Sequence, residues 1–583
     1  MQRATALRET QRVTRGSVRS VILGSALALG AGLALNLATA LPGFAQTQPE
    51  TQTQPETQAQ PEPQAGTASN DQGRPADAKA SSQPGASLSL PEPLLDAAGN
   101  PAPDMSASEA AYKRGDFVTA RAELEKLVTT GHPQVLYRLS LLLVQGKGGA
   151  QDLGRAAGLL QKAADQGNAD ALTLLGQLYL QGSGVRRNAP MAAQLFTRAA
   201  EKGSATAQYF IGKMYREGAG VTADPVKSLT WLQAAARQGV GEAMFELAEI
   251  FGKGLGVTPD EAEALKWLDL ASQTGLPQAQ FTLAQNYSRG GAVARNDEKA
   301  LKLYRDAAEA GYVPAQTALG ALYFAGEGGL AKDTGEALIW FSRAADKGDP
   351  SAQTNLAYMY ATGDGVTRND AQAAKLYQLA AHGGLPRAQA AFAVMLSEGR
   401  GIDKDMKAAE AWYQKAARAG LKSAGTRLGA LYAGGELAVS DKAAVVGWVH
   451  QAALSGDEAA RAWLESATKE GVLAAEGRFA DLIAKGAAGA EPDPDRALSL
   501  YRDAAERGDP FAQLQLGLLY ARGEGVEQDY VTAHKWVNLS AADGNREAVK
   551  SRDLFASLMT PEQISEAQRK AREWTLAHLA GTQ

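Results

Sequence analysis

The 583-residue sequence predicts an all-α protein, a solenoid of about 12–13 stacked antiparallel helix pairs of 36 residues each behind a disordered N-terminal tether. Three observations predict this fold. Glycines recur at a step of 36 or 37 residues, small and aromatic residues hold fixed places within each step, and capping residues mark a second helix in it. Such a period is typical of proteins built from stacked supersecondary units.

The N-terminus has the features of an export leader. Five arginines against one acid in residues 1–19 precede an apolar run over residues 21–41, and small residues at Gly43 and Ala45 follow it. This order predicts a signal peptide over residues 1–45, cleaved after Ala45, with Ala38-Thr39-Ala40 as a second possible cleavage site. The alternative is an uncleaved signal anchor, because about 20 apolar residues can span a bilayer. Either form predicts a periplasmic or secreted protein, in the second case anchored in the inner membrane by residues 21–41.

Residues 46–104 are rich in Pro, Gln and Glu and contain no Phe, Trp or Tyr. Such a segment can bury too little apolar surface to offset the entropy cost of ordering its backbone. The sequence therefore predicts a disordered linker, which its prolines stiffen into a spacer.

The repeat is defined by a glycine that closes segments such as AADQG and AARQG, and we call it the closing glycine. The step between closing glycines is 36 or 37 residues, except for one step of 15 between Gly456 and Gly471. The closing glycines are Gly131, Gly167, Gly203, Gly239, Gly275, Gly311, Gly348, Gly384, Gly420, Gly456, Gly471, Gly508 and Gly544.

The residues after each closing glycine predict a first helix. The fourth residue is alanine in twelve of thirteen copies, the ninth is often small, the twelfth is usually aromatic and the fifteenth is usually glycine. The fourth, ninth and twelfth places lie near one face of an α-helix, where small residues allow a neighbouring helix to approach. The fifteenth-place glycine suits the left-handed position that ends a helix. The list of these glycines is Gly182, Gly218, Gly254, Gly290, Gly326, Gly363, Gly399, Gly435 and Gly523.

A second helix follows in each step and carries a bulky residue, such as Phe196 or Trp231, seven or eight places before the next closing glycine. Its start is marked by Asp, Asn or Pro, which suit the first turn of a helix. The predicted start signals are Asn188, Asp224-Pro225, Pro259-Asp260, Asp297, Asp333, Asp370, Asp441 and Asp529. Helices of roughly 13 residues are marginal alone in water, so we expect the pairs to be stable only when stacked.

The motif resembles that of the Sel1-like repeats, which are similar to tetratricopeptide repeats. The resemblance is carried by AQYFIGKMYREGAGV with ADPVKSLTWLQAAARQG, and by AQLQLGLLYARGEGV with DYVTAHKWVNLSAADG, and it covers roughly residues 109–560. It implies an α-solenoid of the bacterial envelope type. The tail MTPEQISEAQRKAREW resembles the closing helix of bacterial members.

The expected domain order follows from the repeat. Regular repeats occupy residues 107–456 and 491–558, and a capping helix occupies residues 559–583. Residues 457–490 combine features of first and second helices, with Ala460 at the fourth place and Trp463 eight places before Gly471. We therefore expect an extra helix there, with a kink or a change of superhelical phase.

Composition excludes several kinds of chemistry. The absence of cysteine excludes disulfides, cysteine nucleophiles and cysteine-ligated metals, and a net charge of −5 argues against nucleic acid as a partner. The five histidines show no metal-ligand spacing; they are His132, His382, His450, His534 and His578. The GxGV loops, such as that at 182–185, follow helices and so predict helix ends rather than phosphate binding. The acidic run at 491–495 predicts helix capping by Asp493 or Asp495, with calcium binding as the alternative.

These observations predict a protein without catalytic residues, cofactor or metal, whose partner-binding residues the sequence does not identify. The predicted function is a non-enzymatic scaffold for protein–protein interaction in the bacterial cell envelope, with the concave face of the solenoid as the binding surface. Envelope signalling, secretion, host contact and exopolysaccharide assembly are roles that the resemblance implies. The alternative is a glycan-binding module in exopolysaccharide export or cell-wall assembly. Contact with a membrane is expected only through an uncleaved leader.

Overall fold

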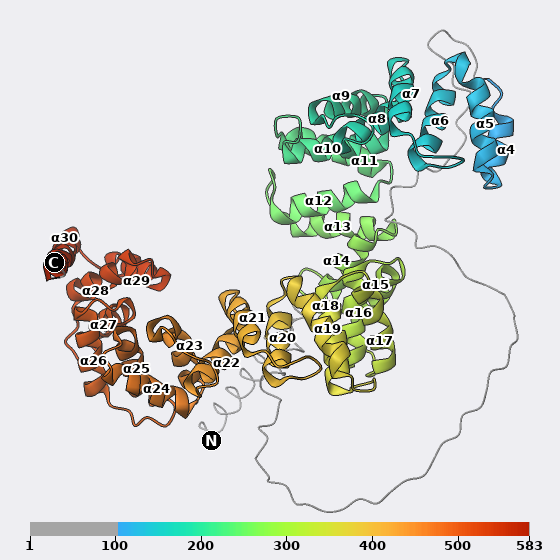
Figure 1. Ribbon diagram of the computed structural model, residues 1–583. Helices are drawn as coiled ribbons and strands as arrows, with labels where there is room; N and C mark the ends of the chain where they lie inside the picture. The colour runs from blue at the N-terminus through green and yellow to red at the C-terminus, as the bar shows by residue number, and fades with distance from the viewer. Residues whose placement is uncertain (1–102, 582–583) are drawn as a thin grey trace, which may run out of the picture. The chain divides into compact units, whose positions relative to one another are not determined.

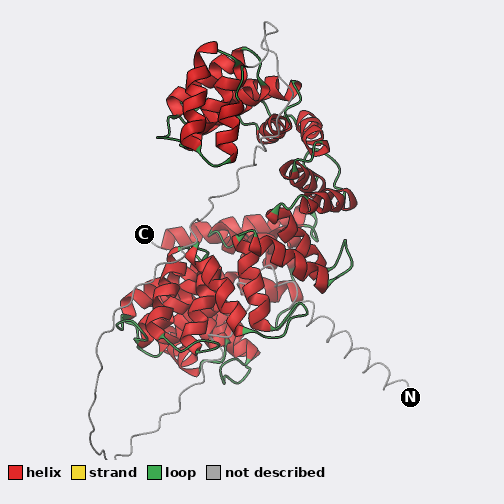
Figure 2. Ribbon diagram, turned by 90° about the vertical axis from the view of Figure 1, so that its right-hand side faces the viewer, coloured by secondary structure: helices red, strands yellow, loops and turns green. Residues whose placement is uncertain are grey.

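The computed structural model describes residues 103–581, and within this range the secondary structure consists of 27 α-helices and one short 3₁₀ helix, with no strand (Figures 1 and 2). The all-α prediction is therefore confirmed. The leader predicted at residues 1–45, and nearly all of the linker predicted at residues 46–104, lie outside the described residues.

The described residues form two compact units. The N-terminal unit comprises residues 103–286 and 291–294, and the C-terminal unit comprises residues 287–290 and 295–581. Each unit is an α-solenoid in which most consecutive helices pack side by side. The helices up to the division are α4 (Ser106–Lys113), α5 (Phe117–Leu127), the 3₁₀ helix η3 (Val128–Thr130), α6 (Pro133–Gln145), α7 (Leu153–Asp165), α8 (Ala169–Gln181), α9 (Ala189–Glu201), α10 (Ala205–Glu217), α11 (Pro225–Arg237), α12 (Gly241–Lys253), α13 (Glu261–Gln273) and α14 (Pro277–Arg289), whose last residues belong to the C-terminal unit.

The remaining helices, which are labelled in Figure 1, all belong to the C-terminal unit. They are α15 (Asp297–Glu309), α16 (Val313–Ala325), α17 (Thr334–Asp346), α18 (Pro350–Thr362), α19 (Asp370–His382), α20 (Pro386–Glu398), α21 (Met406–Arg418), α22 (Lys422–Ala433), α23 (Lys442–Leu454), α24 (Glu458–Lys469), α25 (Leu473–Lys485), α26 (Pro494–Glu506), α27 (Pro510–Arg522), α28 (Tyr530–Ala542), α29 (Arg546–Ala556) and α30 (Pro561–Gly581).

Helix ends follow the capping chemistry that the sequence predicts. In the pair α10–α11, the Ser204 hydroxyl accepts a hydrogen bond from the N–H of Ala207 at 3.3 Å, and Gly218 ends α10 in the left-handed region with φ +69°. Asp224 then caps α11 by accepting from the N–H of Lys227 at 3.0 Å, and Pro225 is the first helical residue. These contacts satisfy backbone groups that have no partner within the helix. Gly435 is an exception among the fifteenth-place glycines, because α22 ends one residue earlier, before Gly434.

Small residues at the fourth and ninth places allow the helices to approach closely. A methyl group added at Gly212 would lie 2.9 Å from Leu232, and one at Gly320 would lie 2.8 Å from the ring of Phe341. Both neighbours are on the second helix of the same pair. The fourth-place alanines are all buried, at 0–1% exposure, and they are Ala171, Ala207, Ala243, Ala279, Ala315, Ala352, Ala388, Ala424, Ala460, Ala475, Ala512 and Ala548. The predicted packing face of the first helix is confirmed.

Two of the predicted second-helix caps are wrong by one residue. Asn296 and Asn369 cap α15 and α19, whereas Asp297 and Asp370 are the first residues inside these helices. At that place a carboxylate cannot reach the N–H groups as a cap does, and arginines bind it instead. The guanidinium groups of Arg295 and Arg368 each donate to these carboxylates at 2.8 Å.

The twelfth-place aromatics hold the two helices of a pair together through their backbone as well as their rings. The carbonyl of Tyr179 accepts from the N–H of the cap Asn188 at 2.8 Å, and that of Tyr215 accepts from Asp224 at 2.9 Å. This hydrogen bond closes the loop between the two helices of a pair. Most of these rings are half-buried, whereas second-helix residues such as Phe196 are fully buried.

The alternation of first and second helices is interrupted at α24. This helix begins at the cap Asp457 and is followed at once by the first-type helix α25, so no second helix pairs with it. As a result α23 packs directly against α25 as well as against α24. The extra helix is present, and the expected change of superhelical phase over residues 457–490 stays a prediction.

The first two helices and the last helix of the described residues depart from the repeat. At the start, α4 and α5 pack on each other, and α5 packs on α6. At the other end, α30 begins with a reciprocal capping box, in which Gln563 N–H donates to the Thr560 hydroxyl at 3.3 Å and Thr560 N–H donates to the Gln563 side-group oxygen at 2.9 Å. α30 packs on α28 through an edge-to-face contact of Trp574 with Trp536. The predicted cap over residues 559–583 thus contains a helix from Pro561.

Candidate functional site: the first-helix face

In each unit the first helices lie on the inner side of the stack. Successive first helices contact each other directly, as α10 does α12 and α18 does α20, and among the regular copies before α24 they do so more than successive second helices. A stack whose first helices are closer together than its second helices curves toward the first helices. The face that the first helices present away from their second helices is therefore the concave one, and we call it the first-helix face.

Side chains reach this face from the third, seventh, tenth and fourteenth places after each closing glycine. These places follow the i, i+4, i+7 spacing of one helical stripe. The fourth-place residues are nearly identical between copies, but the seventh-place residues differ in size, charge and polarity. They are Arg138, Leu174, Phe210, Glu246, Thr282, Ala318, Asn355, Ala391, Arg427, Trp463, Arg478, Gln515 and Ser551. The copies are alike at the fourth place and different at the seventh, where some residues, such as Asn355 and Ala391, are buried and most others are half-buried.

In the N-terminal unit the first-helix face carries an ion-pair network between α10 and α12. Glu246 pairs with Arg216, and its other oxygen lies 4.0 Å from the Lys213 ammonium. Arg216 also contacts Glu249 at 3.5 Å, and Lys253 pairs with Glu249 at 2.8 Å. Burial raises the pKa of Glu246, and the nearby Arg216 and Lys213 charges oppose that shift. These charges are largely satisfied by one another, which favours a role in fixing the spacing of the two helices.

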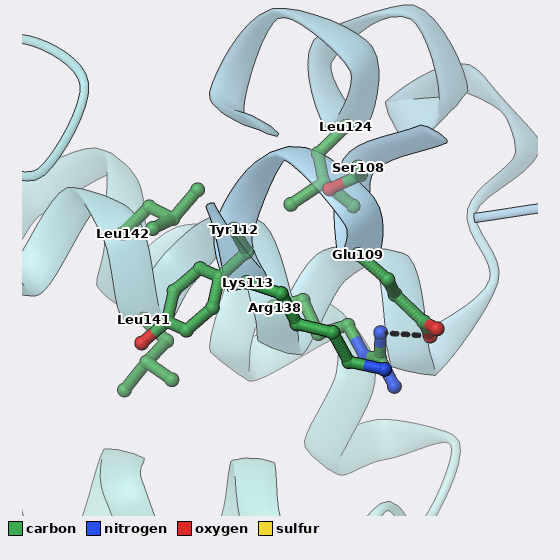
Figure 3. A pocket seen from close by; sticks show the side chains of 8 residues that line it. All are labelled: Ser108, Glu109, Tyr112, Lys113, Leu124, Arg138, Leu141 and Leu142. Atoms are coloured by element: carbon green, nitrogen blue, oxygen red, sulfur yellow. Dashed lines mark hydrogen bonds and ion pairs between the residues drawn. The ribbon is translucent and has the colours of Figure 1, made fainter. Parts of the chain in front are cut away.

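A small hollow lies at the start of the N-terminal unit, between α4, α5 and α6 (Figure 3). Figure 3 shows Tyr112 and Leu141 on one side of it and the ion pair of Glu109 with Arg138 on the other. Its volume is about 50 Å³, whereas pockets for small molecules are about 300–1,000 Å³. The hollow between α4, α5 and α6 is therefore too small to be a pocket for a small molecule.

The C-terminal unit contains a buried polar cluster where α24 interrupts the repeat. Asp481 on α25 accepts hydrogen bonds from His450 Nε2 at 2.9 Å, from Lys485 Nζ at 2.7 Å and from the Tyr501 hydroxyl at 3.2 Å. Asp481 is almost inaccessible, at 2% exposure. Burial alone would raise the pKa of Asp481, but the hydrogen bonds from His450 and Lys485 hold it below its ordinary value. Burial and the Asp481 charge raise the pKa of Tyr501.

The cluster continues to α27 through Arg478. Its guanidinium lies 3.7 Å from Asp509, which caps α27, and stacks on the Phe511 ring at 4.8 Å. Burial lowers the pKa of Arg478 and raises that of Asp509. Residues from α23, α25 and α27 are thus joined by polar contacts. Since the acceptor oxygens of Asp481 are occupied by protein donors, the arrangement suits a structural clamp better than a catalytic site.

The five histidines considered as metal ligands in the sequence lie apart from one another in the structure. His132 caps α6, His382 packs edge-to-face on Trp412, and His578 stacks on Trp574. His534 is buried, which lowers its pKa, and His450 binds Asp481. In the described part of the protein, no three His, Asp or Glu residues are grouped as metal ligands would be. Sequence reasoning missed the pairing of His450 with Asp481, because 31 residues and an irregular helix separate them.

The other candidate motifs are helix ends. Asp493, in the acidic run at 491–495, caps α26 by accepting from Arg496 N–H at 2.9 Å, and Asp495 lies within the first turn. The GxGV loop at 182–185 begins with Gly182, which ends α8 with φ +76°. Among residues 103–581, no helix has both the length and the apolar character that crossing a bilayer requires.

Comparison with known proteins identifies the repeat. The family described as the Sel1 repeat matches ten copies, which together cover more than half of the sequence. The copies are residues 133–168, 169–204, 205–240, 241–275, 277–312, 313–349, 350–385, 386–421, 477–509 and 510–545. Residues 422–476, which include α24, lie outside these copies.

Two solved structures are similar to this protein. A protective antigen of uropathogenic Escherichia coli strains, which displays an SLR fold, is 30% identical over 78% of this protein and 94% of its own length, with a TM-score of 0.51. A Sel1 repeat protein from Oxalobacter formigenes is 32% identical over 53% of this protein and 88% of its own length, with a TM-score of 0.40. No curated protein matches the sequence. The ten matched copies and the first of these relatives show that the protein belongs to the Sel1 repeat family.

Proposed function

We propose that this protein is a non-enzymatic scaffold that binds protein partners on its first-helix face in the bacterial cell envelope. The observation that supports it most is the contrast between places within the repeat. Packing places are nearly constant from copy to copy, while the seventh-place residues vary in charge, size and polarity. A solenoid fold is typical of protein–protein interaction scaffolds, and its extended concave surface suits peptides, helices or whole domains.

The leader predicted at residues 1–45 supports the envelope location, since its arginines and apolar run have the order of an export signal. N-terminal sequencing of the protein purified from cells tests this. A new N-terminus at residue 46 supports cleavage and a periplasmic or secreted protein. An intact N-terminus in the membrane fraction supports the anchor over residues 21–41, and an intact N-terminus in the cytosol contradicts export.

Site-specific photo-crosslinking tests the binding surface. A photoreactive residue placed at Leu174 or Gln515 would project from the first-helix face of one unit. The matched controls are Val226 and Leu379, which are 73% and 50% exposed on second helices. We expect crosslinked adducts to the same protein from the first-helix positions and none from the controls. Adducts only from the controls would contradict the assignment of the face.

Glycan binding is the second candidate function, and it requires solvent-exposed aromatic side chains on which a sugar ring can stack. In the described part of the protein every tryptophan is buried or half-buried, so no tryptophan there offers a fully exposed stacking surface. This observation favours the protein scaffold. Co-sedimentation of the purified protein with peptidoglycan or exopolysaccharide would favour the glycan module instead.

A further inference from the structure

One arginine on the first-helix face of the C-terminal unit has no acidic partner. Arg387 is the second residue of α20, and its Nη1 atom is shielded from solvent with no hydrogen-bond acceptor among the described residues. Burial lowers the pKa of Arg387, and no carboxylate nearby offsets the shift. The N-cap of α20 is Leu385, whose side chain has no acceptor atom. A cation at the positive end of a helix dipole is unfavourable unless an anion lies beside it.

A second unpartnered donor lies on the preceding first helix. Asn355 of α18 is 6% exposed, and its Nδ2 group is shielded from solvent without an acceptor in the part of the protein that the structure describes. A buried amide N–H without a partner costs about 1–3 kcal/mol, so most such groups in proteins are paired. α18 and α20 are in direct contact.

The repeat shows how these two residues correspond to others. Asn355 and Arg387 hold the seventh and third places after Gly348 and Gly384. In the step from α25 to α27 the same places hold Arg478 and Phe511, which stack on each other. The first place after the glycine supplies the acceptor there, because Asp509 lies 3.7 Å from Arg478.

At the step from α18 to α20 this acceptor is replaced by Leu385. Asn355 and Arg387 are therefore two donors at the place where the step from α25 to α27 has the donor Arg478 and the carboxylate of Asp509. The third, seventh and tenth places of α16, α18 and α20 contain no Asp or Glu. The fourteenth place of α20 is Glu398, at the far end of the helix from Arg387, and it pairs with Arg400 at 3.6 Å. The surface next to Asn355 and Arg387 is apolar, with the Tyr358 ring packed edge-to-face on the buried Phe324.

We propose that Arg387 and Asn355 form a binding site for a carboxylate group of the protein partner. The guanidinium would donate to the carboxylate as a charged fork, and the Asn355 amide would donate a further hydrogen bond. The partner group is an acidic residue or the free C-terminus of a polypeptide, which share this chemistry. The inference rests on the proposed scaffold function and specifies what one part of the first-helix face recognises.

The test uses the full-length protein with isotope-labelled arginine and follows the Nε–H signal of Arg387 by NMR, assigned by its loss in R387Q. N-acetylglutamate α-amide carries the γ-carboxylate of an acidic residue, N-acetylalanine carries the terminal carboxylate, and N-acetylglutamine α-amide is the neutral probe. We expect a saturable shift with at least one carboxylate and none with the neutral probe. N355A should weaken binding about tenfold, as loss of a hydrogen bond to a charged group does. The signal of the exposed Arg418 is the internal control.

Three outcomes would overturn the proposal: no saturable shift with either carboxylate, an equal shift with the neutral probe, or tighter binding of inorganic phosphate. A stability measurement adds an independent check. R387Q should not lower the thermal midpoint in carboxylate-free buffer, whereas R400Q should, because Arg400 pairs with Asp370 at 3.1 Å. Equal destabilisation by both would make Arg387 structural.

The two proposals fail separately. Loss of carboxylate binding with crosslinking retained at Leu174 and Gln515 would refute only the carboxylate site. Loss of crosslinking at both positions would refute the scaffold.

Discussion

Replacing Gly429 by alanine tests the close approach of paired helices. Gly429 lies on α22 at the ninth place after Gly420, and a methyl group there would lie 2.1 Å from the carbonyl oxygen of Trp448 on α23. It would also lie 2.9 Å from the backbone nitrogen of Val449. Because these are backbone atoms, a rotamer change cannot relieve the contact. Gly447 on α23 is the matched control, since a methyl group there has no neighbour within 4 Å.

The two substitutions should change stability in opposite directions. Alanine in place of a helical glycine stabilises by about 1 kcal/mol, and this gain applies to both positions. Overpacking costs about 1–3 kcal/mol, and we expect the upper end for Gly429 because the backbone of α23 must move. G429A should therefore lose about 2 kcal/mol, while G447A gains about 1 kcal/mol.

Hydrogen exchange measured by mass spectrometry reports the stability of each helix separately. This is the appropriate measurement for a helical stack, because its parts can unfold independently. Amides of α22 and α23 should exchange about 30-fold faster in G429A and about fivefold slower in G447A, given about 1.4 kcal/mol for each factor of ten. Peptides from α8 to α10 should be unchanged in both variants. Protection in G429A equal to or greater than that of the parent would refute the close approach at this place.

Three further predictions concern single contacts. D481N should lower the free energy of unfolding at neutral pH by about 1.5–3 kcal/mol, because the hydrogen bond to His450 is weakened. The pKa of Asp481 is lowered in the folded protein, so the stability that its charge contributes is lost as pH falls below 3.8. D481N should therefore reduce the loss of stability at acid pH, and an unchanged loss would contradict this. T560A should cost about 1 kcal/mol by removing the capping bond to Gln563, with faster amide exchange confined to α30, and loss of protection elsewhere would contradict it. The buried His534 has a lowered pKa, so stability should fall as pH drops below 6.5, and H534Q should abolish that slope, which denaturant titrations at pH 5 and pH 7 would measure.

The regular part of the fold was predictable because each packing contact depends on residues close in sequence. Ala207, Gly212 and Gly218 have their roles fixed within one helix and its partner, and the repeat shows these roles many times. Cap positions were less certain where two suitable residues are adjacent. Asn296 and Asp297 can both accept from an N–H group, and only the backbone geometry selects the first.

The parts that the sequence did not reveal depend on contacts across an irregular segment or on the absence of a partner. Asp481 meets His450 only because α24 leaves α23 against α25. Arg387 looks like any surface arginine in the sequence. Its importance depends on the burial of its guanidinium and on Leu385 at the place where Asp509 stands in a later copy.

The single helix α24 shows how a repeat protein of this kind can change its length. In a closed globular core, an added helix would displace packing on every side. Here α24 contacts mainly α22, α23 and α25, and the packing of α23 on α25, together with the polar contacts of Asp481, joins the next pair to the stack. Growth by half a module is therefore a local event, and duplication or loss of a segment can lengthen, shorten or rotate the surface beyond it without redesigning the rest. The architecture permits new binding geometries to arise through insertion as readily as through substitution.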